Sequence, residues 1–341
     1  MKTVVVILNW NGVNHLQTYL PSVVTFSNVP IYVIDNGSSD NSVKWISQNY
    51  PEIEIVRLED NLGFAGGYNA GLQKIDADRY VLLNSDVRVG SGWIESVNKS
   101  MLQNDWSICS PVLLDDKNKS YYEYAGAAGG YIDKDGYMFC AGRLFHSIEK
   151  TNKNYNKDTE VFWASGAALF VDAKAWDDVD GFDADFFAHM EEIDLCWRLK
   201  SRGYKVGVCG TTTVHHLGGG TLAASNPLKV YLNFRNNLLI LLKNQDGVPL
   251  FFITKRLLLD GVAAFRFLLK GEITFFLSVA KAHWAFFSMI PNTLSKRGAE
   301  DVARNKSTPN SVGRYTKSIV NQYFINKNTK FSDLTKKDFV N

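Results

Sequence analysis

The chain lacks the features that mark several large classes of protein. Its four cysteines, among 341 residues, form no Cys-x-x-Cys pair, so neither a zinc site nor a disulfide framework is indicated, and a reducing compartment fits best. The 37 Lys and Arg nearly balance the 35 Asp and Glu, and a net charge of +2 argues against a general nucleic-acid-binding protein. The apolar run at the N-terminus ends at Asn9 without a small-residue cleavage site, so we interpret it as a strand and not a signal peptide.

Two common nucleotide-binding fingerprints are also missing. The Gly-rich stretch reads Gly63-x-x-Gly66-Gly67, which is not the G-x-G-x-x-G order of a dinucleotide site, and no acidic residue follows at the expected place. The sequence has no G-x-x-x-x-G-K-[ST] phosphate loop either. A nucleotide bound here would lack the lysine of such a loop, so a metal ion would have to neutralise its diphosphate.

Strand-like and helix-like segments alternate over the first hundred residues, which predicts an α/β fold with a mostly parallel sheet. The expected strands are residues 3–8, 31–34, 54–58 and 80–83. The expected helices are residues 15–24, 42–49 and 64–72, with a further helix at 195–201. We expect loops and irregular hairpins over residues 115–160, where Tyr, Gly, Asp, Lys and Asn are frequent.

Each expected strand ends in polar residues, and in a parallel sheet these ends meet at one edge, where ligands bind. Any one of these clusters alone is ordinary turn chemistry, but four in succession predict a binding site. The clusters are Asn9-Trp10-Asn11, Asp35-Asn36-Gly37-Ser38-Ser39-Asp40, the stretch from Asn61 through Gly63, Phe64 and Gly67 to Asn69, and Asn84-Ser85-Asp86. The carboxylate of Asp86 suits a hard divalent cation that also binds substrate phosphates.

The stretches VVVILNWNG, VIDNGSSDNS, NLGFAGGYNAGL and LLNSDV resemble the nucleotide-binding half of the inverting glycosyltransferases of family 2, which have the GT-A fold. The likeness continues through FWASGAALFV, GFDADFFAHMEEIDLCWRLKSRGYKV, VHHLGGGT and YLNFRNNL, and it covers roughly residues 1–240. It is strongest to bacterial rhamnosyltransferase-type enzymes of surface polysaccharide synthesis. The resemblance implies a catalytic domain over residues 1–244, in which about 1–100 bind the nucleotide and 101–244 the acceptor, followed by a separate region, 245–341.

The resemblance also implies roles for single residues. Asp35 would read the nucleobase with help from the turn at residues 9–11, and Asn69 and Asn84 would lie near the ribose and diphosphate. Asp86 would bind Mg²⁺ or Mn²⁺ as the end of an Asp-x-Asp motif whose first position is Asn84 here, and His215 or His216 would add a ligand. The rest of the nucleotide-sugar site would comprise Asn36, Ser38, Asn61, Gly63, Phe64, Gly67, Ser85, Gly166, Arg235 and Asn236.

The acidic cluster Glu191-Glu192-x-Asp194 has two readings. Carboxylates at a helix start complement the helix dipole, which accounts for one or two of these acids. Inverting sugar transfer also needs a general base that deprotonates the acceptor hydroxyl. The resemblance assigns that role to Glu192, where the family usually has Asp, and we keep Glu191 and Asp194 as alternates.

Residues 243–297 hold eight Lys or Arg against three acids, together with many Phe and Leu. Wound as a helix, residues 255–270 place their charges on one arc and most of their apolar side chains on the other. We interpret this stretch as a peripheral contact with an anionic membrane, and the alternative is a helix packed on the catalytic domain. Because no uncharged stretch of 18 residues occurs here, we do not expect a membrane-spanning helix.

The sequence thus predicts a cytoplasmic, metal-dependent inverting glycosyltransferase on the inner face of the plasma membrane. Its donor would be a nucleotide-diphosphate sugar, with rhamnose as one candidate, and its acceptor a glycan or a lipid-linked glycan. A nucleotidyltransferase is the first alternative, although no basic residue follows the first strand closely. A non-catalytic nucleotide- or glycan-binding relative is the second, because Asn84 and Glu192 depart from the family pattern.

Overall fold

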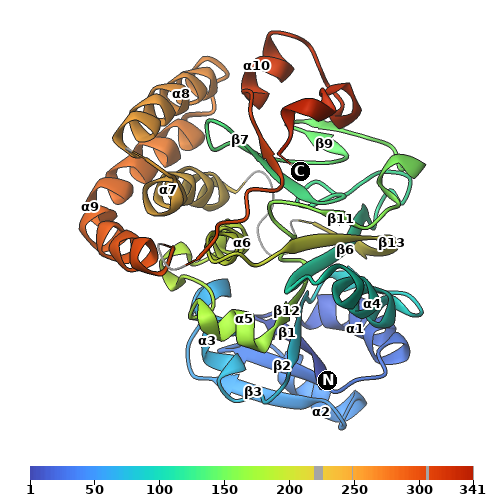
Figure 1. Ribbon diagram of the computed structural model, residues 1–341. Helices are drawn as coiled ribbons and strands as arrows, with labels where there is room; N and C mark the ends of the chain where they lie inside the picture. Colours follow the sequence, from blue (N-terminus) through green and yellow to red (C-terminus); the bar gives the residue numbers. More distant parts are fainter. Residues whose placement is uncertain (219–225, 248, 305–306, 341) are drawn as a thin grey trace.

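The protein is described here by a computed structural model that covers residues 1–218, 226–247, 249–304 and 307–340. A nine-stranded sheet runs through it in the order β11-β13-β6-β12-β4-β1-β2-β3, and the short β5 pairs with β13 (Figure 1). The strands are β1 (Thr3–Asn9), β2 (Ile31–Asn36), β3 (Glu54–Leu58), β4 (Arg79–Asn84), β5 (Val87–Arg88), β6 (Ile108–Asp115), β11 (Thr159–Glu160), β12 (Ala168–Asp172) and β13 (Val206–His216). The helices are α1 (Val13–Phe26), α2 (Ser42–Asn49), α3 (Gly63–Leu72), α4 (Trp93–Asn104), α5 (Ala173–Asp178), α6 (Glu191–Ser201), α7 (Pro227–Asn244), α8 (Pro249–Leu269), α9 (Ile273–Arg304) and α10 (Ile319–Phe324).

The four N-terminal strands are mutually parallel, which confirms the predicted α/β class. Successive side chains of these strands point to opposite faces of the sheet and pack in two separate cores, one on each face. Val5 and Ile7 of β1 pack in the core formed with α1, α2 and α4, whereas Val4 and Val6 pack in the core formed with α3, α5 and α6. Strand β12 lies antiparallel between β4 and β6, so it carries residues 163–167 to the edge where β4 ends.

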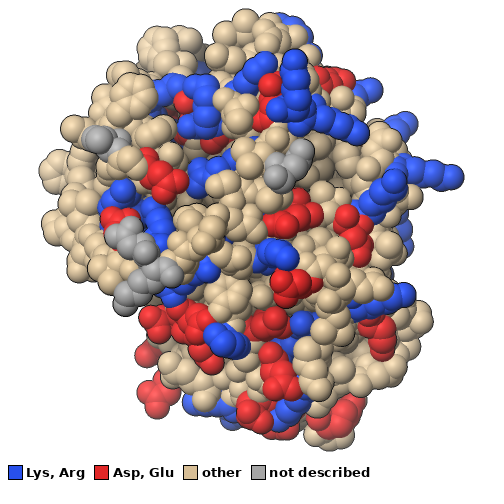
Figure 2. All heavy atoms as spheres, viewed as in Figure 1, with Lys and Arg blue, Asp and Glu red and all other residues tan. Residues whose placement is uncertain are grey.

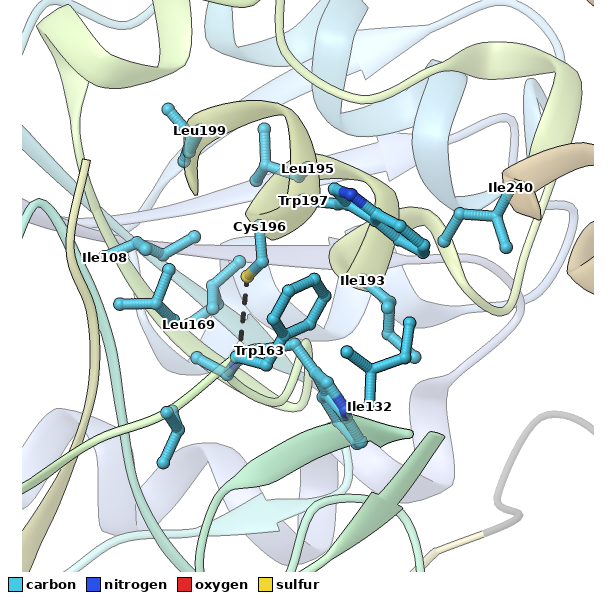
Figure 3. Packing of buried hydrophobic residues seen from close by; sticks show 14 of the residues in the cluster. Ile108, Ile132, Trp163, Leu169, Ile193, Leu195, Cys196, Trp197, Leu199 and Ile240 are labelled. Atoms are coloured by element: carbon cyan, nitrogen blue, oxygen red, sulfur yellow. Dashed lines mark hydrogen bonds between the residues drawn. The ribbon is translucent and has the colours of Figure 1, made fainter. Parts of the chain in front are cut away.

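Helix α6 is buried between the main sheet and the C-terminal half of the molecule. Figure 3 shows the Cys196 side chain on the side of Leu169 from β12 and Ile108 from β6, and Trp197 and Ile193 on the side toward Ile240 of α7. The Trp197 ring meets the Phe162 ring edge-on at 5.3 Å between centroids. A helix held on all sides in this way fixes the position of the acidic residues at its start.

A second, five-stranded sheet has the order β10-β9-β8-β7-β14. Its strands are β7 (Gly130–Asp133), β8 (Met138–Cys140), β9 (Arg143–Leu144), β10 (Ser147–Ile148) and, from the end of the chain, β14 (Arg314–Tyr315). The last residues pack on this sheet through a cluster of rings that includes Tyr131, Phe139 and Phe339. Region 245–341 therefore has two parts: α8 and α9, which with α7 form an outer helical layer, and a tail that completes the second sheet (Figure 1).

Candidate active site

The ends of β1 and β2 form a hydrogen-bonded cluster. The Asn9 amide nitrogen lies 3.4 Å from Asp35 Oδ1 and 3.1 Å from Ser38 Oγ, and the Asn11 backbone N–H donates to the same Ser38 oxygen at 3.0 Å. Asn9 Oδ1 is buried and has no hydrogen-bond partner among the described residues. The neighbouring Trp10 side chain is 46% exposed, which is a large fraction for an aromatic ring. The structure thus brings the expected base-binding residues together, with an unused acceptor and an accessible ring.

The Gly-rich segment after β3 packs the chain closely instead of forming an open phosphate cradle. A Cβ on Gly63, whose φ is +74°, would lie 2.5 Å from the Phe187 ring, and one on Gly67 would lie 2.9 Å from the Asn36 amide nitrogen. The N–H of Phe64 donates to the Phe187 carbonyl at 2.7 Å, so a donor at the start of α3 is already used. The Asn36 amide donates to Asn61 Oδ1 at 3.0 Å. These five residues, which we expected at the nucleotide, hold α3 against β2 and the 187 loop.

A buried group of two carboxylates and one histidine lies where β4 and β13 end. Asp86 Oδ1 is 3.2 Å from His216 Nε2, and the other ring nitrogen, Nδ1, is 3.5 Å from Glu123 Oε1. All three side chains are at most 10% exposed. Glu123 was not among the residues expected from the sequence, because it lies in a loop-rich stretch without a motif. The fold places it beside a histidine that is far away along the chain.

The charges in this group support one another. Burial disfavours a charged imidazole, but hydrogen bonds and charge from Asp86 and Glu123 outweigh it and raise the pKa of His216 to about 10. Burial likewise opposes ionisation of Asp86, and the bond and charge of His216 nevertheless lower the pKa of Asp86. The Asp86 carboxylate is therefore ionised at neutral pH.

The structure decides between the two histidines. His215 pairs with Arg88 and His216 with Val87 in the β13–β5 ladder, and successive side chains of a strand point to opposite faces. His215 consequently lines a cavity of about 380 Å³ with Arg88 and Lys119, away from Asp86. The Gly219–Thr221 part of the VHHLGGGT motif lies outside the described residues.

The start of α6 lies beside the end of β4. The Asn84 N–H donates to the Ala167 carbonyl at 3.0 Å, and the preceding residue, Gly166, lies against Glu192: a Cβ on Gly166 would be 3.4 Å from Glu192 Cβ. Glycine at this position thus keeps the space next to the Glu192 side chain free. The short path Asn84–Ala167–Gly166–Glu192 joins the expected diphosphate end of the sheet to the expected base.

The three acids of α6 have different environments. Asp194 is fully buried and accepts from Arg198 at 2.7 Å and from Lys243 at 3.0 Å; burial opposes its ionisation, but these cations hold the pKa of Asp194 below its ordinary value. Burial raises the pKa of Glu192 to about 7, and burial together with Glu192 raises the pKa of Glu191 well above its usual range. Of the three, only Glu192 keeps partial exposure. Asp194 is therefore an internal ion-pair residue, and Glu192 is the acid open to a ligand.

Arg235 and Asn236 of α7 do not point into open space, as a diphosphate contact would require. The Asn236 amide lies within 3.0 Å of the carbonyls of Phe186, Ala188 and His189, and an Arg235 guanidinium nitrogen is 2.9 Å from the Phe186 carbonyl. This loop has left-handed φ values at Phe187, His189 and Met190. Such conformations are strained, and the converging donors of α7 stabilise them. Asn236 and Arg235 thus position the start of α6.

Asn69 also serves the fold in this structure. Its amide nitrogen donates to the Phe182 carbonyl at 2.7 Å, and its oxygen accepts from the Phe182 N–H at 3.0 Å. Both ends of the side chain are therefore occupied by the backbone that leads into the 183–190 loop. A direct contact of this amide with a ribose would have to replace these bonds, and the place of Asn69 at the ribose stays a prediction.

Comparison with known proteins identifies the family. Residues 4–173 match the family described as "Glycosyl transferase family 2". The chain belongs to this family. Among curated proteins, this family 2 chain is similar to the N-acetylglucosaminyl-diphospho-decaprenol L-rhamnosyltransferase of Mycobacterium tuberculosis, with 26% identity over 253 residues, 64% of this chain and 76% of that protein.

Solved structures support the fold of this family 2 chain. Staphylococcus aureus TarS 1–349 in complex with UDP-GlcNAc has a TM-score of 0.54 and 13% identity, and the match covers 90% of this chain and 88% of that one. GalNAc-T7 with UDP, GalNAc and Mn²⁺ has a TM-score of 0.53 and 16% identity over 71% of this chain. The match spans about half, 47%, of the GalNAc-T7 chain. These likenesses confirm the predicted GT-A fold.

Proposed function

We propose that this family 2 protein is a metal-dependent inverting glycosyltransferase that uses a nucleotide-diphosphate sugar. The observation that carries the proposal is the pairing of the ionised Asp86 with His216 at the strand ends, one short segment away from Glu192. The first site suits the leaving diphosphate, and the second suits the attacking hydroxyl. Separate sites for the two partners are what a displacement reaction requires.

Asp86 and His216 fit a divalent metal by the chemistry of their donor atoms. A carboxylate oxygen is a ligand for Mg²⁺ and Mn²⁺, and the imidazole nitrogen of His216 would become one only when metal binding displaces its proton. Asn84 occupies the first position of the expected Asp-x-Asp motif, so Asp86 is the single carboxylate of that motif. Within the described ranges no group of three or more His, Cys, Asp or Glu residues is arranged to hold a metal, so phosphate oxygens and water would complete its coordination. A bound cation would supply Lewis-acid stabilisation of the charge that develops on the β-phosphate.

Glu192 is the residue that we assign as general base. Its carboxylate accepts the proton of the acceptor hydroxyl while the hydroxyl oxygen attacks the anomeric carbon from the face opposite the diphosphate, so that the configuration inverts. A pKa near 7 suits this step, because a substantial share of the group is then ionised at neutral pH and the carboxylate is basic enough to take a proton. The buried ion pairs of Asp194 keep α6, and hence Glu192, in place.

We propose a glycan or lipid-linked glycan as the acceptor, and rhamnose as the first sugar to test. The similarity to a rhamnosyltransferase that acts on a polyprenyl-linked sugar supports both choices. The experiment is a panel of nucleotide sugars, including rhamnose and N-acetylglucosamine donors, assayed for release of nucleoside diphosphate with Mn²⁺, Mg²⁺ or EDTA. Metal-dependent release supports the proposal, whereas binding of every donor without turnover would indicate the non-catalytic alternative.

A further inference from the structure

Helix α8 directs its polar arc toward the protein. Lys255 donates to Asp135 Oδ1 at 2.6 Å, and Arg256 donates to Asp260 Oδ1 at 2.7 Å. The Arg256 guanidinium also lies 4.4 Å from the centre of the Tyr137 ring, and Asp260 is only 2% exposed. Most of the charges that make this helix amphipathic are therefore used in internal contacts.

The apolar arc of α8 faces away from the protein and continues onto α9. Leu258, Val262 and Leu269 are 70%, 68% and 73% exposed, and Trp284 of α9 is 81% exposed. We call this surface the outer face and define it by Leu258, Val262, Phe265, Leu269, Leu277 and Trp284. Figure 2 shows the edge of the molecule over α8 and α9 as mostly uncharged. A surface helix in water normally has the opposite orientation, so this face requires an apolar partner.

The charges that border the outer face are positive. Arg266 and Lys270 on α8 and Lys281 on α9 are exposed, each within one helical turn of an apolar residue of the face. None of the three forms an ion pair with any residue of the described ranges, and the nearby Glu272 is partly buried. A tryptophan and leucines flanked by cations match the interface of a membrane with anionic lipids, of which the cytoplasmic leaflet is an example.

We propose that the outer face of α8 and α9 docks in the interface of an anionic membrane, with both helices lying along the surface. Helix α9 is long and apolar enough to cross a membrane by length and composition, whereas no membrane-spanning helix was expected here from the sequence. Its inner side nevertheless packs on the protein, where Val279, Ala282 and Phe286 are at most 1% exposed. Crossing would remove these contacts, whereas interfacial docking keeps them.

The same helix connects the outer face to the candidate active site. Toward its C-terminal end, Asn292 and Lys296 each contact Asp185 Oδ2 at 2.6 Å, and Lys296 also binds Asp183. Both aspartates belong to the loop that leads into Glu192. A docked outer face would therefore hold the site at a fixed orientation to the membrane, as a lipid-linked acceptor requires.

The test uses the full chain without donor or acceptor, so that it can fail independently of the proposed function. We expect the protein to co-sediment with vesicles of phosphatidylcholine and phosphatidylglycerol and much less with phosphatidylcholine alone. The combined variant Leu258→Gln, Val262→Gln and Leu269→Gln should lower partitioning by at least about ten-fold, because three apolar side chains no longer enter the interface. The control is Leu102→Gln on α4, a leucine that is also 70% exposed but lies off the face.

A second variant tests the cationic border. Replacing Arg266, Lys270 and Lys281 with Gln should weaken binding about five-fold per residue, or roughly a hundred-fold in all, at low salt. The matched control replaces the exposed Lys44, Lys74 and Lys99 of the nucleotide-binding half and should change binding little.

Two results would overturn the proposal. One is a chain that ignores anionic vesicles. The other is a chain that dimerises in light scattering and becomes monomeric in the apolar variant, because a second copy would then cover the face. If the apolar variant folds poorly, the fluorescence of Trp284 in the unmodified chain can report whether the outer face enters the membrane. Its fluorescence should be quenched by brominated lipids, and Trp284→Phe should remove that signal.

Discussion

The two groups of carboxylates in the candidate active site are both buried, yet they carry different charges. At the strand ends, Asp86 lies beside an imidazolium, and its pKa is lowered. At the start of α6, no cation contacts Glu192 among the described residues, and its pKa rises to about 7. Burial alone raises the pKa of any carboxyl group, and the neighbouring charge decides the outcome. The ionised Asp86 thus suits the binding of a metal ion, whereas Glu192 suits the uptake of a proton from a substrate hydroxyl.

The largest expected effect concerns Asp86. Asp86→Ala should abolish the metal-dependent part of nucleoside diphosphate binding, because it removes the only carboxylate of the motif Asn84-Ser85-Asp86. Calorimetric titration with nucleoside diphosphate, with and without Mn²⁺, measures this, and Asp76→Ala on the exposed surface is the control. If Asp86→Ala retains the full Mn²⁺ requirement, the metal lies elsewhere.

The Glu192→Gln variant tests the other group. It keeps the size of the side chain but cannot accept a proton, so kcat should fall by about 10²–10⁴ while donor affinity changes little. Glu191→Gln is the matched control, since it alters the adjacent buried acid and should retain far more activity. If Glu192→Gln turned over normally and Glu191→Gln had no activity, Glu191 would be the general base instead.

Glu123→Gln sharpens the comparison at the strand ends. It removes the charge that faces His216 Nδ1 and so weakens the orientation of the ring toward Asp86. We expect about 10–100-fold weaker Mn²⁺ binding, as is typical when a residue that orients a metal-binding histidine is changed. The readout is the Mn²⁺ signal in electron paramagnetic resonance, which does not depend on activity. An unchanged affinity would reduce Glu123 to a packing role.

The pH dependence of activity gives the smallest effect. A base must be deprotonated, and the raised pKa of Glu192 places its titration near neutrality. Below about pH 7, kcat/KM should therefore fall about ten-fold per pH unit, and above it the activity should level off. An acidic limb displaced far below neutrality would instead indicate a carboxylate in the environment of Asp194, where cations lower the pKa.

The elements of the nucleotide-binding half could be predicted closely from sequence. The expected strands at 54–58 and 80–83 correspond to β3 (Glu54–Leu58) and β4 (Arg79–Asn84). Local apolar runs and turn residues define such elements, so the pattern is readable in one segment at a time. Contacts between segments that are distant along the chain could not be predicted from the sequence. Arg235 and Asn236 were expected at a phosphate, but they bind the 185–189 carbonyls, which only the packing of α7 brings close.

The sequence by itself determined the parallel α/β arrangement of the N-terminal half and the gathering of polar residues at its strand ends, because strand period and turn chemistry are local properties. It also determined that residues 255–270 form an amphipathic helix. Only the tertiary structure decided which histidine meets Asp86, which acid of α6 is paired with cations, and which arc of α8 faces outward. Each of these depends on a partner supplied from elsewhere in the chain: Glu123 for His216, Lys243 for Asp194, and Asp135 for Lys255.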